Sequence, residues 1–206
     1  SMVSSLILNY YTYSGRKIVG ISASKGGSSI KEWQSTGIYL KDVRQRLNGC
    51  LSYLEKQNIR VRDIFMFWCQ GETDGDNSMT KEEYKQKFNS MWQFMKTELN
   101  VSKCFVVRIG YVNNSVVPNK YVTIIEAQRE ICEYSDELIL VSTRFDSMKS
   151  EGLMRDSFHY KQIGYNLTGE DAGKNTAYYL KTGRKPSFYD WHYNDIYVPK
   201  YGTKKE

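Results

Sequence analysis

The clearest chemical signal in the sequence is a carboxylate placed three residues before an imidazole, Asp156 and His159 in the run Arg155-Asp-Ser-Phe-His. At this spacing the carboxylate can accept the Nδ1 proton of the ring, which leaves Nε2 free to act as a general base. The other histidine, His192, lies in an aromatic C-terminal segment, where packing or surface exposure is expected. His159 is therefore the candidate catalytic base, and Asp156 is the acid that orients it.

Two other groups could stabilise negative charge on a substrate. Gly26 and Gly27 follow an apolar run and precede a helical pattern, and backbone N–H groups in such a turn can face a developing oxyanion because no side chain blocks the approach. Gln70 ends a second apolar run, so its amide can supply another donor. Glu72 and Asp74 follow at once, and a polar turn with helix-capping roles is their ordinary interpretation.

The elements that must position these groups alternate between strands and helices. Each expected strand is apolar almost throughout, which is typical of a strand covered on both faces; the runs are 17–24, 63–70, 103–110 and 138–144. Amphipathic patterns predict helices over residues 38–57, 80–99, 121–134 and 162–181. This alternation predicts a three-layer α/β/α sandwich with a parallel sheet. Ligands bind beyond the carboxyl ends of strands in such sheets, so Gly27, Gln70 and His159 should meet at one edge.

The order of the elements suggests an incomplete sheet. The chain opens with a helical pattern over residues 5–13, whereas a doubly wound sheet usually begins with a strand. We therefore expect an α/β domain over residues 1–185 that lacks its first strand. Residues 186–206, rich in Tyr, Asp and Lys, are expected to form a C-terminal surface tail.

Composition excludes several classes of protein. The net charge is +6, but the basic residues are scattered, which favours a mildly basic surface over a nucleic-acid footprint. No apolar run approaches the roughly 20 residues of a membrane helix, so no membrane partner is expected. The four cysteines form no C-x-x-C pair, which argues against zinc and thioredoxin-type chemistry. No metal-binding pattern is visible, and we expect no cofactor.

Three segments together resemble a known family. They are Lys25-Gly-Gly-Ser-Ser-Ile30 with Trp33, Trp68-Cys-Gln-Gly-Glu-Thr-Asp74, and Asp156-Ser-Phe-His159. They are similar to the later sequence blocks of the SGNH (GDSL-type) hydrolases. The best match is the branch that contains carbohydrate-esterase family six acetylxylan esterases and sialate O-acetylesterases. The hallmark of that branch, W-x-Q-G-E-x-D, is matched in full at residues 68–74, and the resemblance runs in the right order from 18 to 173.

The resemblance implies a fold, an activity and a set of roles. The fold would be the flavodoxin-like α/β/α sandwich of SGNH hydrolases, and the activity would be removal of acetyl groups from an acetylated carbohydrate. Gly27 and Gln70 would form the oxyanion hole. Asp156 and His159 would be the acid and base of a Ser-His-Asp triad, and Glu72 would be an additional or alternative partner that orients the histidine.

The nucleophile of the family is missing from the sequence. In the family this serine lies in a G-Q-S-N motif after the first strand, and no such motif occurs here. We expect it upstream of this chain, in agreement with the missing strand. Ser28 and Ser29 lie beside the Gly26-Gly27 turn, but helix capping is their expected role. The chain alone is therefore expected to hydrolyse esters poorly or not at all.

Two other functions remain open from the sequence. The first is a glycan-binding domain without catalysis, in which aromatic side chains such as Trp33, Tyr111 and Phe158 hold the sugar. The second is a flavodoxin-like nucleotide-binding domain, with the Gly26-Gly27 turn at a helix N-terminus as its anion site. That domain would lack the G-x-x-x-x-G-K-[ST] phosphate loop and would leave Asp156 and His159 without a role.

Overall fold

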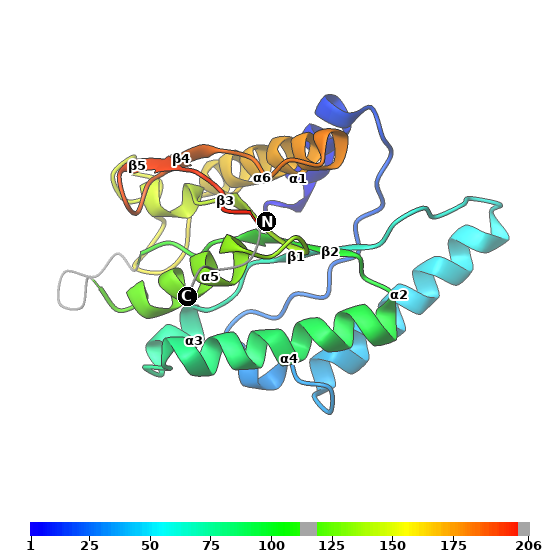
Figure 1. The fold of residues 1–206 in the computed structure, drawn as a ribbon, viewed down its shortest axis with the longest axis horizontal. Coiled ribbons are helices and arrows are strands. Elements are labelled where there is room, and N and C mark those ends of the chain that lie inside the picture. The colour runs from blue at the N-terminus through cyan, green and yellow to red at the C-terminus, as the bar shows by residue number, and fades with distance from the viewer. Residues whose placement is uncertain (112–118, 202–206) are drawn as a thin grey trace.

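A computed structural model describes residues 1–111 and 119–201, and it contains a three-stranded parallel sheet (Figure 1). The strands are β1 (Phe65–Trp68), β2 (Lys103–Val107) and β3 (Leu138–Ser142), hydrogen-bonded in the order β1-β2-β3. They lie inside three of the four runs expected to be strands, so those three predictions are confirmed. The central strand β2 is buried on both faces, as a strand between two helical layers must be.

Helices cover both faces of the sheet, and their bounds follow the amphipathic patterns closely. The helices of four residues or more are α1 (Val3–Ser14), α2 (Ile38–Lys56), α3 (Glu72–Asp76), α4 (Lys81–Leu99), α5 (Val122–Glu133) and α6 (Gln162–Thr182), with a 3-10 turn at Arg144–Ser147. Thr80 begins α4 by accepting a hydrogen bond from the Glu83 N–H, as the sequence pattern indicates. Gly183, in a left-handed conformation with φ of 70°, ends α6.

Alternate residues of β2 divide the core into two halves. Cys104 and Val106 pack on the side of α2, α4 and α5, whereas Phe105 and Val107 pack on the side of α1 and α6. Figure 1 shows these two helical layers on opposite faces of the sheet. The predicted three-layer α/β/α sandwich is therefore confirmed.

Small residues allow α1 and α6 to pack closely. A Cβ at Gly169 would collide with the Met2 carbonyl oxygen, and a Cβ at Gly173 would collide with the Leu6 carbonyl oxygen. The two helices can therefore approach backbone to backbone. Leu6 of α1 then lies in the same core half as Phe105 of β2.

The prediction of a strand over residues 17–24 is wrong. These residues form an extended chain without strand pairing, and Val19 and Ile21 are 58% and 41% exposed. The segment is attached to the two helical layers instead: Gly20 lies against the Ile7 side chain of α1, and the Ser22 carbonyl accepts a hydrogen bond of 3.2 Å from Arg46 of α2. A strand requires a hydrogen-bonded neighbour, and no strand among the described residues provides one for this segment.

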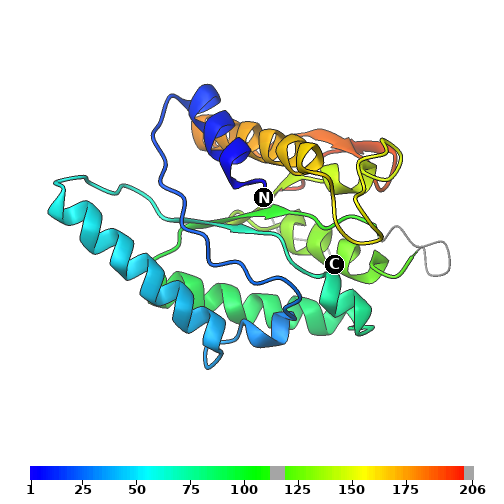
Figure 2. The ribbon, with the colours of Figure 1, turned by 180° about the vertical axis from the view of Figure 1, so that it is seen from behind.

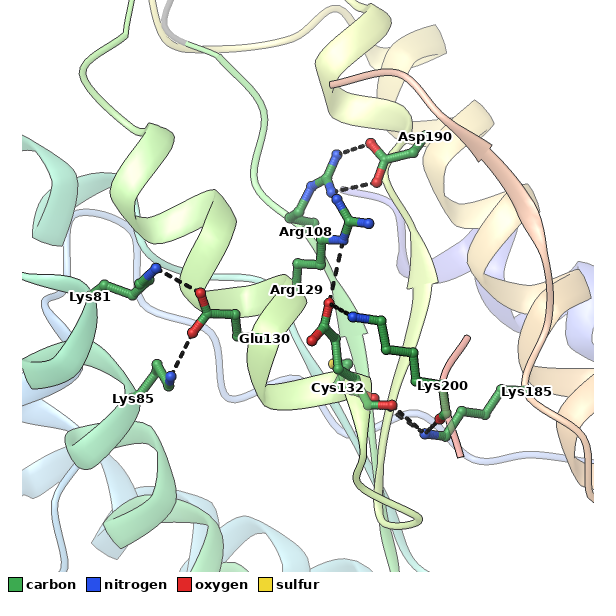
Figure 3. Close-up of polar contacts among 10 residues, drawn as sticks. Lys81, Lys85, Arg108, Arg129, Glu130, Cys132, Lys185, Asp190 and Lys200 are labelled. Atoms are coloured by element: carbon green, nitrogen blue, oxygen red, sulfur yellow. Dashed lines mark hydrogen bonds and ion pairs between the residues drawn. The ribbon is translucent and has the colours of Figure 1, made fainter. Parts of the chain in front are cut away.

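The C-terminal residues form an antiparallel hairpin of β4 (Phe188–Asp190) and β5 (Asp195–Tyr197). Its Asp190 is buried and accepts hydrogen bonds of 2.8 and 2.5 Å from Arg108, which follows β2 (Figure 3). Just before the hairpin, Lys185 donates to the carbonyl oxygens of Cys132 and Glu133, and so caps the C-terminal end of α5 (Figure 3). Within the described residues no helix is long and apolar enough to span a membrane.

Candidate active site

The loop that carries Asp156 and His159 is folded around the carboxylate. Asp156 Oδ1 accepts hydrogen bonds from the backbone N–H groups of Phe158 (2.9 Å) and His159 (2.7 Å). The His159 Nδ1 atom lies 2.9 Å from Asp156 Oδ2. The donation from Phe158, then that from His159, holds the pKa of Asp156 well below its usual range. Because the carboxylate stays charged and accepts, Nδ1 carries the proton and Nε2 is the free nitrogen of a half-exposed ring.

Gln70 follows β1 and joins the Gly26-Gly27 turn to the end of the sheet. Its Nε2 donates to the Ser28 carbonyl oxygen (2.8 Å) and to Asp74 Oδ2 (2.6 Å), so both amide protons have acceptors. Gly27 has a φ of 72°, in the left-handed region that favours glycine, and open space surrounds the position that a Cβ would take. The structure therefore places the Gly27 turn directly beside Gln70.

Asp74 holds this arrangement together, and sequence reasoning assigned it no more than a turn or capping role. Its fully buried carboxylate accepts from the Ser29 hydroxyl (2.5 Å), the Ile30 N–H (3.0 Å) and the Gln70 amide. The last residue of the W-x-Q-G-E-x-D pattern is thus the clamp between the turn and the strand end. Only its place in that pattern gave a signal, since two of its three donors, Ser29 and Ile30, lie 45 and 44 residues away.

The two serines beside the turn are engaged in structural bonds. Ser28 Oγ donates to the Lys25 carbonyl and accepts from the Trp33 indole N–H. Ser29 Oγ bonds Asp74 and caps the short 3-10 helix Ile30–Glu32, which confirms the capping expected of it. Among the described residues the side-chain hydrogen bonds of His159 go to Asp156 alone.

The His159 loop lies near the residues that follow β1. Tyr160, next to His159, is buried and stacks on Phe145 at 4.3 Å between ring centroids. Burial, and then the charge of Glu72, raises the pKa of Tyr160 well above its usual value. Cys69, which directly follows β1, packs against the same half of the core as Tyr160. Glu72 is not hydrogen-bonded to His159, and burial raises its own pKa.

Trp33, which the sequence offers as a sugar contact, has a structural role. Trp33 is buried edge-to-face against Trp68, so it cannot hold a glycan as the glycan-binding alternative requires. Burial, and then the Glu72 charge, raises the pKa of Cys69, so its thiol stays protonated and is a poor nucleophile. Phe158, in contrast, is 52% exposed beside His159.

The geometry of the Gly26-Gly27 turn also disfavours the nucleotide-binding alternative. The N–H of Ser29 donates to the Glu32 carboxylate, and the N–H of Ile30 donates to Asp74. These donors lie at the start of the three-residue 3-10 helix Ile30–Glu32 that follows the turn, and because carboxylates already occupy them they are not open to a phosphate. In the described part of the chain, no group of three or more His, Cys, Asp or Glu side chains could hold a metal ion.

Comparisons with known proteins agree with the fold of the chain. The chain is similar to an X-ray structure of a protein from Arabidopsis thaliana at 18% sequence identity, with a TM-score of 0.53. The match covers 76% of this chain and 57% of that chain, so the present chain spans little more than half of that protein. No curated protein matches. The family described as carbohydrate esterase, sialic acid-specific acetylesterase, matches residues 7–177. Since that match spans most of the sequence, the chain belongs to this carbohydrate esterase family, with its SGNH-like fold.

Proposed function

We propose that this protein removes acetyl groups from the hydroxyls of a carbohydrate by a Ser-His-Asp mechanism. The family match supports the reaction class. The single observation that carries the proposal is the His159 ring, bonded at Nδ1 to Asp156 at 2.9 Å and free at Nε2. An imidazole held in this way is the general base that an otherwise weak alcohol nucleophile requires.

In the proposed reaction a serine attacks the acetyl carbonyl while His159 Nε2 takes its proton, and Asp156 stabilises the imidazolium that forms. The C=O oxygen becomes an oxyanion, which the Gly27 N–H and the Gln70 amide stabilise. The intermediate then collapses, His159 gives the proton to the sugar oxygen as the C–O bond breaks, and water repeats the sequence on the acetyl-enzyme. Loss of one oxyanion donor typically slows such a reaction by roughly 10²–10³-fold.

To donate to an oxyanion, Gln70 must give up one of the hydrogen bonds that its amide makes in the structure. Both of its amide protons are bonded in the structure, one of them to the Ser28 carbonyl oxygen. We propose that the substrate oxyanion takes the place of that carbonyl, while the bond to Asp74 keeps the amide in position. From its place in the W-x-Q-G-E-x-D pattern, Glu72 is proposed as an additional or alternative residue that orients His159.

The nucleophilic serine of the proposal lies outside these 206 residues. The sequence has no G-Q-S-N motif, and the hydroxyls of Ser28 and Ser29 are engaged in other bonds. We therefore expect the chain alone to turn over p-nitrophenyl acetate poorly, with a rate that His159→Ala leaves unchanged. Strong hydrolysis that depends on His159 would contradict a serine from outside the chain.

The acetylesterase proposal itself is tested on a protein that includes the serine. Acetate release from O-acetylated sialic acid should fall by about 10³-fold or more in His159→Ala, mainly through kcat, because the base acts on the transition state. A His159→Ala protein that keeps its full rate would exclude His159 as the base.

Glycan binding without catalysis is the second candidate, and the engaged serines favour it. The exposed Phe158 ring is its best contact for a sugar, since Trp33 is buried. In this case binding of an O-acetylated glycan by the chain alone would survive His159→Ala and be lost in Phe158→Ala.

A further inference from the structure

The C-terminal hairpin carries two aromatic rings on its surface. Tyr189 of β4 and Trp191, which directly follows β4, are each 38% exposed. Their rings meet edge-to-face, with centroids 4.8 Å apart, and we call them the aromatic pair. The Tyr189 hydroxyl donates a hydrogen bond to the side-chain oxygen of Asn194 in the hairpin turn. The hairpin therefore presents apolar ring surface to solvent with polar groups directly beside it.

Residues that follow β3 hold the aromatic pair in place. The Thr143 hydroxyl donates to the Tyr189 carbonyl oxygen (3.1 Å). The guanidinium of Arg144 lies over the Trp191 ring, with its Cζ atom 4.7 Å from the ring centroid. Arg144 is itself fixed by a hydrogen bond of 2.8 Å to the Glu151 carboxylate. Side chains that are already held in this way lose little conformational entropy when a ligand binds, so the pair is preorganised.

The aromatic pair lies at the same end of the sheet as the His159 loop. Phe145, next to Arg144, stacks on Tyr160, which directly follows His159. Figure 2, like Figure 1, shows the orange-red hairpin at the same end of the sheet as the yellow chain that leads into α6. Among the described residues the ring contacts of Trp191 do not include the His159 loop. The pair is therefore a neighbour of the candidate active site, linked to it through the stacked rings.

We propose that the aromatic pair is a sugar-binding subsite, which holds the unit of the glycan next to the acetylated one. This inference rests on the proposed function and narrows its substrate to an oligosaccharide. The axial C–H groups of a pyranose carry partial positive charge, and they stack on the negative faces of aromatic rings. The hydroxyls of the sugar need polar partners at the rim of such a site. The Tyr189 hydroxyl, the Asn194 side-chain amide and the Arg144 guanidinium lie beside the rings and supply them.

A protein partner fits the aromatic pair less well. Even with the exposed side chains of Ile196, opposite Tyr189 in the hairpin, and of Val198, the pair offers on the order of 400 Å² of apolar surface. Each partner of a stable protein–protein interface buries about 800 Å². A single pyranose needs only one or two rings and so matches the pair in size. Phe158, exposed beside His159, is a separate ring and would contact the acetylated unit itself.

Binding to the 206-residue chain, followed by NMR titration, tests the subsite. The probes are O-acetylated sialic acid and a trisaccharide that ends in the same acetylated sugar. The trisaccharide should bind about tenfold more tightly than the single sugar, as expected for one added stacking contact, and should shift the indole N–H signal of Trp191. Trp191→Ala should remove the difference between the probes, and Trp191→Phe, which keeps a ring, should preserve most of it. Tyr53→Ala removes an exposed ring from α2 and is the control, which should keep the whole difference.

The possible results separate the subsite from the proposed function. In a protein that includes the serine, Trp191→Ala should raise KM for the trisaccharide about tenfold more than KM for the single sugar. Trisaccharide binding that depends on Trp191, together with a full rate in His159→Ala, supports the subsite and rejects the proposed function. Hydrolysis that depends on His159, with equal effects of Trp191→Ala on both probes, supports the function and overturns the subsite. Equal affinity of the unmodified chain for both probes also overturns it, and so does self-association that Trp191→Ala abolishes, since that indicates a second copy.

Discussion

At the scale of single residues, two carboxylates do different work at the same edge of the sheet. Asp156 is an exposed carboxylate that collects two backbone N–H groups and an imidazole, which shapes its own loop. Asp74 is fully buried and joins segments that are far apart in the sequence. One carboxylate organises a turn, and the other joins the turn around Gly27 to the end of β1.

The depressed pKa of Asp156 predicts how its loop responds to acid. An acid whose folded pKa lies below its unfolded value of 3.8 stabilises the folded loop above that value, and loses this contribution as the pH falls through the folded pKa. The amide NMR signals of Phe158 and His159 should therefore keep their hydrogen-bonded shifts to well below pH 3.8. Their loss at or above pH 3.8 would show that the carboxylate is not held in this way.

Removal of the Asp74 carboxylate should destabilise the protein strongly. Asp74→Ala leaves the Ser29 hydroxyl, the Ile30 N–H and the Gln70 amide buried without an acceptor, and unmet groups of this kind cost about 1–3 kcal/mol each. Urea unfolding should show a loss of several kcal/mol, on the order of 3–5. The exposed Glu82 nearby is the control, and Glu82→Ala should change stability by less than about 0.5 kcal/mol. A similar small loss for both variants would rule out the clamp.

At the scale of elements, the helices depend on the local sequence pattern, whereas the strands depend on their neighbours in space. The amphipathic spacing of α2, α4, α5 and α6 is satisfied by burying one face, which needs no particular partner sequence. A strand is different, since its backbone groups are satisfied only by another strand. Residues 17–24 have the right composition for a strand and fail to form one for this reason.

The close contact between α1 and α6 predicts that alanine destabilises the fold at Gly173. The same substitution at Gly49, an open position of α2, should stabilise it. Gly173→Ala should destabilise the fold by about 1–3 kcal/mol, because the new Cβ meets the backbone of α1 at Leu6 and Tyr10. Gly49→Ala, at an exposed position of α2 with open space around it, should stabilise the fold by about 0.5–1 kcal/mol through helix propensity. Thermal unfolding distinguishes the two signs, and a stabilising Gly173→Ala would disprove the close packing.

At the scale of the whole molecule, one buried arginine connects the sheet to the C-terminal hairpin. Arg108 follows β2 and is fully buried, with Asp146 after β3 on one side and Asp190 of β4 on the other. The pairing with Asp190 holds the hairpin over the carboxyl edge of the sheet. The C-terminal residues are thus attached to the same edge as the candidate site.

Replacement of Arg108 should release that hairpin. Arg108→Leu leaves two buried carboxylates without a counter-charge, which typically costs about 3–5 kcal/mol. Hydrogen exchange should accelerate over Phe188–Tyr197 before the helices are affected. Lys200→Ala is the control: its pairing with Glu133 is half-exposed on the Lys200 side, and its loss should cost no more than about 1 kcal/mol. A hairpin that stays protected in Arg108→Leu would show that the ion pairs do not hold it.

The sequence by itself determined those features that depend on residues close together along the chain or on a matched motif. These are the four long helices, the three paired strands and the esterase family; the Asp156–His159 hydrogen bond has the geometry that its three-residue spacing implies. Only the tertiary structure decided that residues 17–24 stay unpaired, that Asp74 clamps the Gly27 turn to Gln70, and that Trp33 is buried. Each of these depends on which distant segment lies alongside, because hydrogen-bond partners and burial are properties of neighbours in space. The proposed catalytic roles depend on one more such neighbour, the serine that must approach His159.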